Sequence, residues 1–246
     1  METPPTHRPS DDIFATTRWT MVLNAGRPGV PQAGAALTDL CQTYWYPLYA
    51  YVRHRGHAPH DAEDLTQGFF EKLLRLESLA TVSPEKGKFR AFLLASMKNF
   101  LTEVWHKASA QRRDVRLTIP LDAEAAETRY ANEPAETLTP ERLFDRQWAL
   151  TLLDAVLRRL AADYEKQNKG KLFQALKFAI TGEKNALPYR DLAAQLSISE
   201  EALRVTIARL RKSYRRVLEE EIAHTVANQA EAKEELQALR RILSET

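Results

Sequence analysis

The residues of this sequence best suited to chemistry are cations at helical spacing. From Arg204 to Arg216, six positive charges fall within 13 residues with no acid among them. Guanidinium and ammonium groups at this density bind phosphates, and arginine also recognises base edges in the major groove of DNA. The pattern indicates DNA binding. The residues expected to take part are Arg204, Val205, Thr206, Arg209, Arg211, Lys212, Arg215 and Arg216.

The elements around these cations argue against the usual explanation of a basic run, which is a solvated face on an unrelated helical bundle. Residues 187–216 predict a helix, a short turn and a second helix, with Leu192 and Leu196 on the apolar side of the first. Ser199 is placed to cap the second helix, whose basic face then suits the major groove. Its first turns are expected to reach base edges, and its later cations to meet phosphates.

A second basic stretch accompanies the clearest helical period in the chain, which runs from Phe89 to Trp105. Cations beside aromatic rings are what binding of a separated DNA strand requires. Most of the rings, Phe92 and Phe100 among them, are expected in the core, whereas Trp105 suits either role. The cations on the polar side are Lys86, Lys88, Arg90, Lys98, His106, Lys107, Arg112 and Arg113.

Acidic and polar residues mark the start of the preceding predicted helix, whose apolar side contains Leu65, Phe69 and Leu73. Asp61 stands at the expected N-cap of that helix. Acids in this place are common in a solvated, well-capped helix start, and they equally supply an acidic binding face. That face consists of Asp61, Glu63, Asp64 and Gln67.

No set of residues in the sequence points to catalysis. His54, His57 and His60 lie close to two aspartates, but a helix ends among them, so their spacing does not place them on one face. The single cysteine, Cys41, excludes an intramolecular disulfide, and neither a nucleophile motif nor a glycine-rich phosphate loop is present. We therefore expect no enzyme, no catalytic residue, no bound metal and no cofactor.

Helical periodicity covers most of the chain and no strand-rich stretch occurs, so we expect an all-α fold with two small helical domains. The length of 246 residues allows two modest cores. A net charge of only +2 requires DNA-binding charge to be segregated locally. Because no apolar run is long enough to span a bilayer and no export signal is seen, we expect a soluble, cytoplasmic protein without membrane insertion.

Breaks in the periodicity divide the chain into five parts. They are an N-terminal arm (1–34), a first helical domain (35–112), a flexible acidic linker (113–139), a second helical domain (140–222) and a C-terminal helical extension (223–246). The first part of the linker alternates between apolar and polar residues, as a short strand or an extended docking segment would. The extension has apolar residues at helical spacing and is expected to pack on its own domains or on a regulator.

Residues 187–216 resemble the promoter minus-thirty-five reading domain of extracytoplasmic-function (ECF) sigma factors, a subgroup of the sigma-70 family. A Leu-x-Tyr-x-acid-aliphatic-Ala opening begins at Leu187 and leads into a turn and a basic helix. Ser197 departs from the glycine usual in that turn. Residues 61–70 and the helix from Phe89 are similar to the polymerase-binding and minus-ten segments of the same family, with Gly68 in place of an expected acid.

The resemblance implies a sigma factor that carries bacterial RNA polymerase to specific promoters and helps to open them. Sigma region 2 (35–112) would bind the clamp helices of the beta-prime subunit through the acidic face, and region 4 (140–222), which would also meet the beta flap, would read the minus-thirty-five element with its helix-turn-helix. An anti-sigma factor or other regulator is a further expected partner. The minus-ten residues would be Lys98, Asn99, Glu103, Trp105, His106, Lys107, Arg112 and Arg113.

The alternative interpretation is that the chain is a helix-turn-helix regulator, or a polymerase-associated adaptor, without initiation activity of its own. A helix-turn-helix alone does not separate these classes, because repressors and sigma factors dock in the major groove in the same way. The discriminating features are the acidic face and the third helix of the first domain.

Overall fold

The computed structural model describes residues 33–74, 88–108, 123–132, 138–182, 187–226 and 228–245. Within these ranges every regular element is a helix and no strand occurs, which confirms the all-α prediction. The chain divides into two compact units: unit 1 comprises Met1–Thr151 and Ile222–Thr246, and unit 2 comprises Leu152–Glu221. The predicted N-terminal arm and the alternating part of the linker lie outside the described residues, apart from the last two positions of the arm.

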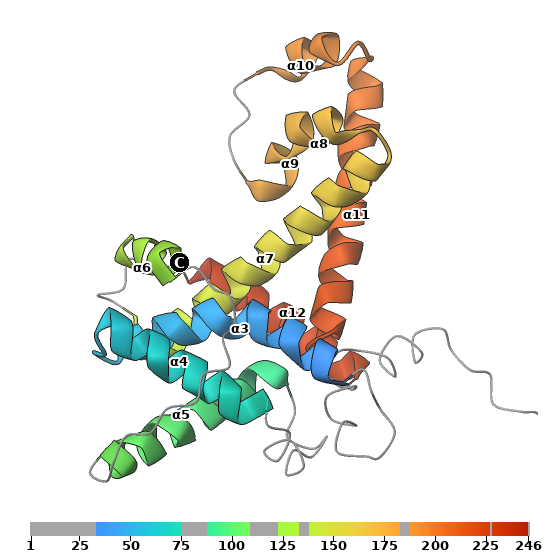
Figure 1. Ribbon diagram of the computed structural model, residues 1–246. Coiled ribbons are helices and arrows are strands. Elements are labelled where there is room, and N and C mark those ends of the chain that lie inside the picture. The colour runs from blue at the N-terminus through green and yellow to red at the C-terminus, as the bar shows by residue number, and fades with distance from the viewer. Residues whose placement is uncertain are drawn as a thin grey trace, which may run out of the picture. The chain divides into compact units, whose positions relative to one another are not determined.

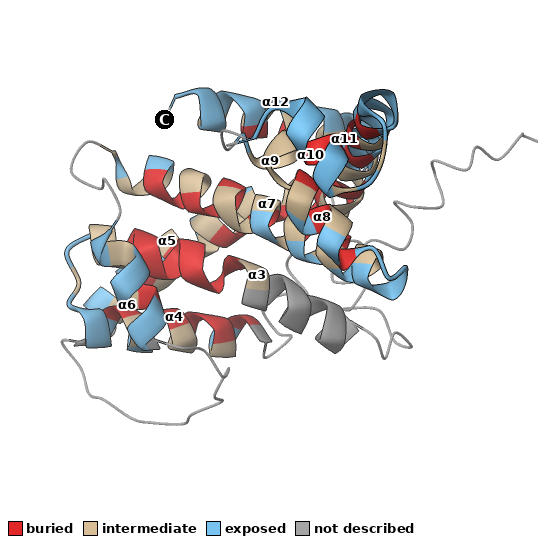
Figure 2. Ribbon diagram, turned by 90° about the horizontal axis from the view of Figure 1, so that it is seen from above, coloured by how far each residue is buried: buried red, intermediate tan, exposed pale blue. Residues whose placement is uncertain are grey.

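Three helices form the centre of unit 1: α3 (Ala33–His54), α4 (Pro59–Leu74) and α5 (Phe89–Ala108). They lie side by side (Figure 1), and buried residues follow the described part of α3 (Figure 2). On α5 the buried side chains recur every fourth residue, at Phe89, Leu93, Met97 and Leu101. This unbroken period makes α5 an amphipathic helix that turns one face to the core and leaves the other polar.

Helix α4 begins at Pro59, two residues before the N-cap predicted at Asp61. Proline is favoured in the first turn of a helix because it has no N–H that would be left without a partner there. Asp61 therefore lies within the first turn, where its carboxylate still interacts favourably with the helix dipole.

Part of the predicted flexible linker is a helix, α6 (Ala123–Ala131), so that prediction was wrong for these residues. Ala126 is buried, and the carboxylate of Glu127 accepts hydrogen bonds from Arg53 on α3 at 2.7 and 2.9 Å and from the Tyr49 hydroxyl at 2.5 Å. The hydrogen bonds from Arg53 hold the pKa of Glu127 below its usual value. Small helix-forming alanines let this acidic segment fold against α3.

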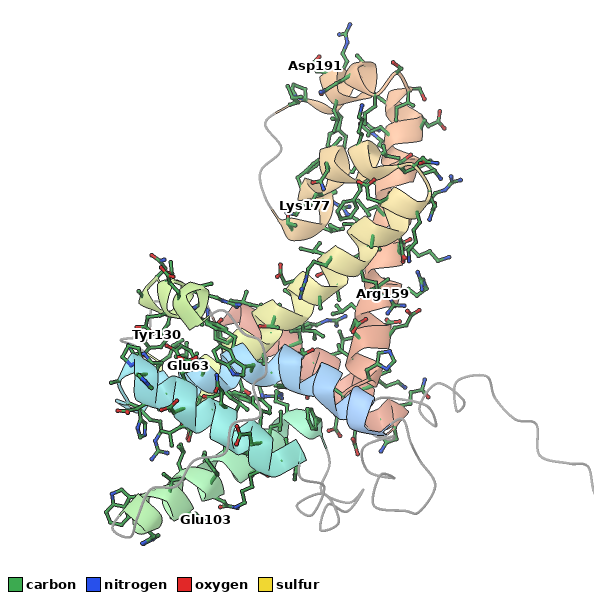
Figure 3. All side chains as sticks on the ribbon, viewed as in Figure 1. Glu63, Glu103, Tyr130, Arg159, Lys177 and Asp191 are labelled. Carbon is green, nitrogen blue, oxygen red and sulfur yellow. The ribbon has the colours of Figure 1, made fainter. Side chains whose placement is uncertain are left out.

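Unit 2 is built from the later part of α7 (Pro140–Lys166), then α8 (Gly170–Leu176), α9 (Phe178–Thr181), α10 (Tyr189–Gln195) and most of α11 (Glu200–Ala223). Its core contains Leu160, Phe173, Leu203 and Leu210. Arg159, labelled in Figure 3, joins α7 to α11 through ion pairs with Glu220 at 2.5 Å and Glu221 at 2.8 Å.

The first turns of α7 belong to unit 1, although residues from 140 onward were expected in the second domain. Leu143, Phe144 and Trp148 are buried there, and the Trp148 indole N–H donates a hydrogen bond of 3.1 Å to the Tyr44 hydroxyl of α3. The helical period of α7 continues through Leu152 without interruption, so periodicity alone does not reveal where one core ends and the next begins.

The C-terminal extension contains the predicted helix, α12 (Gln229–Ser244), within unit 1. The Asn228 side chain caps it by accepting a hydrogen bond of 3.0 Å from the Glu231 backbone N–H. Glu235 and Leu239 are buried, so this helix packs on its own domain, the first of the two expected destinations. None of the helices in the described part of the chain has the length and apolar character that crossing a membrane requires.

Candidate functional site

The acidic face of α4 presents the predicted residues together. Asp61 and Asp64 are exposed, whereas Glu63 and Gln67 are half-buried and joined by a hydrogen bond of 3.3 Å. Glu63 is labelled in Figure 3. We call these four residues, Asp61, Glu63, Asp64 and Gln67, the acidic strip. Glu63 and Asp64 lie four and three residues before Gln67 and so share one side of α4 with it, while the buried Phe69 anchors the helix to the core.

The polar side of α5 carries two ion pairs among the residues expected to meet DNA. Lys98 lies 2.8 Å from Glu141 at the start of α7, and Glu103, labelled in Figure 3, lies 2.6 Å from Lys72 of α4. All four side chains are about half exposed, and pairs of this kind contribute about 0–1 kcal/mol. A phosphate group can therefore replace Glu141 at Lys98 at little cost.

Trp105 lies on the exposed side of α5, with 75% of its surface accessible. Its ring meets the His106 ring edge-on, with centroids 5.0 Å apart, and Asn99 is also exposed on this helix. A tryptophan so open to water contributes little to a core, which leaves its ring available for stacking. The side chain of Lys107 and the whole of Arg112 and Arg113 lie outside the described residues.

Two other cations expected on the polar side, Lys88 and Arg90, are held in ion pairs within unit 1. Arg90 is paired with Glu235 at 2.8 Å and with Asp145, and Lys88 lies 3.2 Å from Glu234. These partners stand 55 to 146 residues away in sequence, so nothing in the local pattern distinguishes the two cations from the exposed ones.

The turn between α10 and α11 forms as the sequence predicted. The Ser199 hydroxyl accepts a hydrogen bond of 3.1 Å from the Ala202 backbone N–H, which confirms the predicted cap. Ser197 has φ of 55°, in the left-handed region that glycine adopts most easily. The glycine expected from the family resemblance would suit this position, and Ser197 occupies it at a small conformational cost.

The basic face of α11 divides into cations held within unit 2 and cations that are not. Leu203, Ile207 and Leu210 are buried on the inner side, as predicted. Arg204 lies 3.7 Å from Glu200, Arg211 donates to the Ala179 carbonyl at 3.1 Å, and Arg216 lies 2.6 Å from Glu220. The cations without a partner among the described residues are Arg209, Lys212 and Arg215.

The two uncharged residues expected on this face differ from each other. Val205 is 45% exposed and stands outward. Thr206 is half-buried, and its hydroxyl donates to the Ala202 carbonyl at 2.7 Å. Val205 therefore remains accessible for an apolar contact, whereas the hydroxyl proton of Thr206 is already used within the helix.

A hollow of about 530 Å³ opens beside the basic face, between α10 and α11. Tyr189 of α10 lines it together with Arg204, Arg211 and Arg215 of α11. The three arginines are seven and four residues apart, so they form a positive stripe along one side of α11. Such a stripe suits a row of phosphate groups.

The histidine cluster considered from the sequence is not drawn together. His54 Nε2 lies 2.7 Å from the Leu138 carbonyl oxygen, and His60 Nδ1 lies 3.2 Å from the Asp64 carboxylate. Within the part of the chain that the structure describes, no group of three or more histidine, cysteine or acidic side chains is arranged to hold a metal ion.

Residues 36–111 match the family model described as Sigma-70 region 2. The matched stretch is just under a third of the 246-residue chain and contains nearly all of α3 and the whole of α4 and α5. It thus includes the acidic strip of α4 and the exposed end of α5. No curated protein and no solved structure matches the chain.

Proposed function

We propose, from the premise that its region 2 domain makes this chain a sigma-70 family sigma factor, that it belongs to the ECF subgroup and directs polymerase to specific promoters. Region 2 of this family binds core RNA polymerase and the promoter minus-ten element, and sigma factors are not enzymes. The observation that carries the proposal is a capped turn and basic helix in unit 2 of a chain whose other unit contains region 2.

In this proposal the acidic strip of α4 binds the clamp helices of the polymerase beta-prime subunit. Asp61 and Asp64 are exposed, and Glu63 with Gln67 continues the strip along the helix. Exposed carboxylates increase the rate at which a basic partner associates, and they favour that partner over others. Residues 61–67 thereby provide the contact that a DNA-binding regulator does not need.

The exposed side of α5 reads the minus-ten element and stabilises the separated strands. Trp105 offers a stacking surface, and Asn99 and Lys98 offer a hydrogen-bonding amide and a cation. Stacking of one base on an aromatic ring contributes about 1–3 kcal/mol. Glu103, His106, Lys107, Arg112 and Arg113 complete the proposed minus-ten set.

Replacing Trp105 and Asn99 together with alanine is expected to slow promoter opening by about tenfold or more, since about 1–3 kcal/mol of stacking is lost. Binding of holoenzyme to the closed duplex should change much less, because α11 supplies separate contacts. Permanganate reactivity of minus-ten thymines, followed over time, measures opening. Thr102→Ala is a matched control on the exposed side of the same helix. Equal permanganate reactivity in variant and wild type would assign this face a structural role.

The basic helix α11 reads the minus-thirty-five element in the major groove. The contacts proposed for base edges come from Arg204, Val205, Thr206 and Arg209, and those for phosphates from Arg211, Lys212, Arg215 and Arg216. Because Arg209 and Arg215 have no partner among the described residues, neither must break an ion pair to meet DNA. These two arginines make the division testable.

Arg209→Ala is expected to cost about 1–3 kcal/mol at the preferred sequence and to relax selection at one or two base pairs. Arg215→Ala should weaken all sequences alike and reduce the salt dependence by about one unit of slope. Binding of the full chain to minus-thirty-five duplexes and their point variants across a salt series measures both. Identical sequence profiles and identical slopes for the two variants would make the face a non-specific one.

Transcription from a promoter by purified core polymerase with and without this chain tests the function itself. A sigma factor produces a defined start only when it is present. A helix-turn-helix regulator would bind DNA without producing a start, and a polymerase-associated adaptor would bind the core enzyme without producing one. The polymerase partner also sets the expected place of action, which is the bacterial cytoplasm.

A further inference from the structure

We infer that Glu235 of α12 is a positioning residue for α5, the helix that carries Trp105, and that residues 222–245 therefore belong to the promoter-opening unit. The inference rests on the proposed function and deepens it. It concerns a segment outside the residues that match the region 2 model, 36–111. Glu235 is a buried carboxylate, and no reaction in the proposed function uses it.

The Glu235 side chain is only 1% exposed, and its two oxygens are used by a single guanidinium group. Arg90 Nε lies 2.8 Å from one oxygen and Arg90 Nη2 lies 3.1 Å from the other. Lys88 adds a cation at 3.4 Å. A two-point contact between a planar fork and a carboxylate fixes direction as well as distance, so this pair orients α12 and the first turn of α5.

Arg90 is held on its other sides by α7. Its guanidinium carbon lies 4.4 Å from the centre of the Trp148 ring, and its Nη1 pairs with Asp145. Burial raises the pKa of Asp145, which disfavours its charged form. Asp145 contacts the Arg90 guanidinium group through one oxygen, whereas Glu235 contacts it through both. Removing Glu235 would leave the guanidinium with one partially desolvated acid and a ring face, and with freedom to turn.

The start of α5 is fastened to the same C-terminal segment by its backbone. The Phe89 N–H donates to the Thr225 carbonyl at 3.1 Å, and the Phe89 ring meets Tyr44 edge-on with centroids 5.1 Å apart. Nearer its other end, α5 is held by α4 through the Phe69–Phe100 ring contact at 5.8 Å. Besides its buried apolar side, α5 is therefore held by α4 near Phe100, by Glu141 of α7 at Lys98, and by residues 225–235 at its start.

Loss of the Glu235 contact releases the first turn of α5, and a shift of that turn tilts the helix about its remaining contacts. Arg90 stands ten residues before Phe100 and Trp105 five residues after it, which is about 15 Å and about 7.5 Å along a helix. A tilt of α5 about the Phe100 contact therefore moves the Trp105 ring by about half as much as it moves Arg90, in the opposite direction, relative to the residues of α4 that bind polymerase. Displacement of a working group by about 1 Å can cost a large factor in rate.

The experiment compares Glu235→Ala and Glu235→Gln with the matched control Glu234→Ala in full-length chains. Glu234 is the neighbouring acid of the same helix, is 66% exposed and, among the described residues, pairs with Lys88. Each chain is assembled with core polymerase, its affinity for the core is measured, and opening is then followed at saturating holoenzyme with 2-aminopurine in the minus-ten element. The promoter is one on which the wild-type holoenzyme initiates.

Glu235→Ala is expected to slow opening by about tenfold while affinity for the core changes less than about twofold, since the acidic strip on α4 is untouched. Glu235→Gln, which keeps a hydrogen-bond acceptor for Arg90, should recover part of the rate, and Glu234→Ala should match wild type. If Glu235 had only a structural role, the amount of opened promoter would fall only in proportion to the amount of holoenzyme that assembles.

Opening as fast in Glu235→Ala holoenzyme as in wild type would overturn the inference, and so would a loss explained wholly by poor assembly. If Glu235→Ala does not fold, Glu235→Gln decides. Holoenzyme with the Glu235→Gln chain must open the promoter more slowly than wild type, and amide exchange in the first turn of α5 must be faster. A wild-type value for either measurement would refute the positioning role of Glu235. A wild-type chain that forms no active holoenzyme would instead refute the proposed function.

Discussion

Replacing Trp148 with alanine is expected to lower the free energy of unfolding of unit 1 by about 3–5 kcal/mol, the usual range for deleting a buried large aromatic side chain. Trp148 is 1% exposed. The substitution also leaves the Tyr44 hydroxyl without its indole donor and removes the ring that faces the Arg90 guanidinium. It tests whether the first turns of α7 belong to the core of unit 1.

Native-state amide exchange measures this effect separately in each unit. Amides of α3 and α5 should lose protection in the Trp148→Ala chain, whereas amides of α10 should change little. The matched control is Trp105→Ala, the same substitution at a position that is 75% exposed, where a change within about 0.5 kcal/mol is expected. Equal losses for the two tryptophans, or a loss confined to α10, would place the boundary of unit 1 elsewhere.

Reversing Asp61 and Asp64 together to lysine is expected to weaken binding to core polymerase by about a hundredfold. Like charges brought together in an interface cost several kcal/mol, and both side chains are exposed on the acidic strip of α4. Lysine in the first turn of α4 also opposes the helix dipole, at a cost of about 0.3–1 kcal/mol. Circular dichroism must therefore show that the variant is folded before binding is compared.

The control for this prediction carries the same change in net charge elsewhere in unit 1. Glu124 of α6 and Glu245, which follows α12, are exposed acids outside the strip, and reversing both to lysine should leave polymerase binding near the wild-type value. If a pull-down of core enzyme retains equal amounts of the Asp61, Asp64 variant and wild type, the strip on α4 is not the polymerase contact.

Elements with a strong local signal were predictable from the sequence. Phe89, Leu93, Met97 and Leu101 recur at the spacing that makes one face of a helix apolar, and all four are buried. The turn before α11 was equally predictable, because serine is a common N-cap residue and the Ser199 hydroxyl caps this helix. In both places local preference and packing agree, and such agreement makes a sequence easy to interpret.

The missed features depend on contacts between distant residues. Helix α6 has a weak apolar face, and its docking relies on Glu127 meeting Arg53, 74 positions earlier. The spacing of Ala126, Glu127 and Tyr130 fits one face of a helix, although it does not identify the partner of that face. Arg90 was grouped with the DNA-facing cations because its partner, Glu235, stands 145 positions later. Whether Trp105 is buried or exposed likewise depends on what the rest of the chain covers.

Unit 1 is made of two stretches of chain, and the whole of unit 2 is synthesised between them. Glu235 and Thr225, which fasten the start of α5, therefore leave the ribosome only after unit 2 has emerged. Domains often fold in the order of their synthesis, but unit 1 cannot complete its core in that order. Until then Arg90 lacks Glu235, and a chain interrupted before residue 222 would have α5 without the contacts that residues 225–235 provide. Helix α5 therefore reaches its final position only after residues 222–245 have been synthesised.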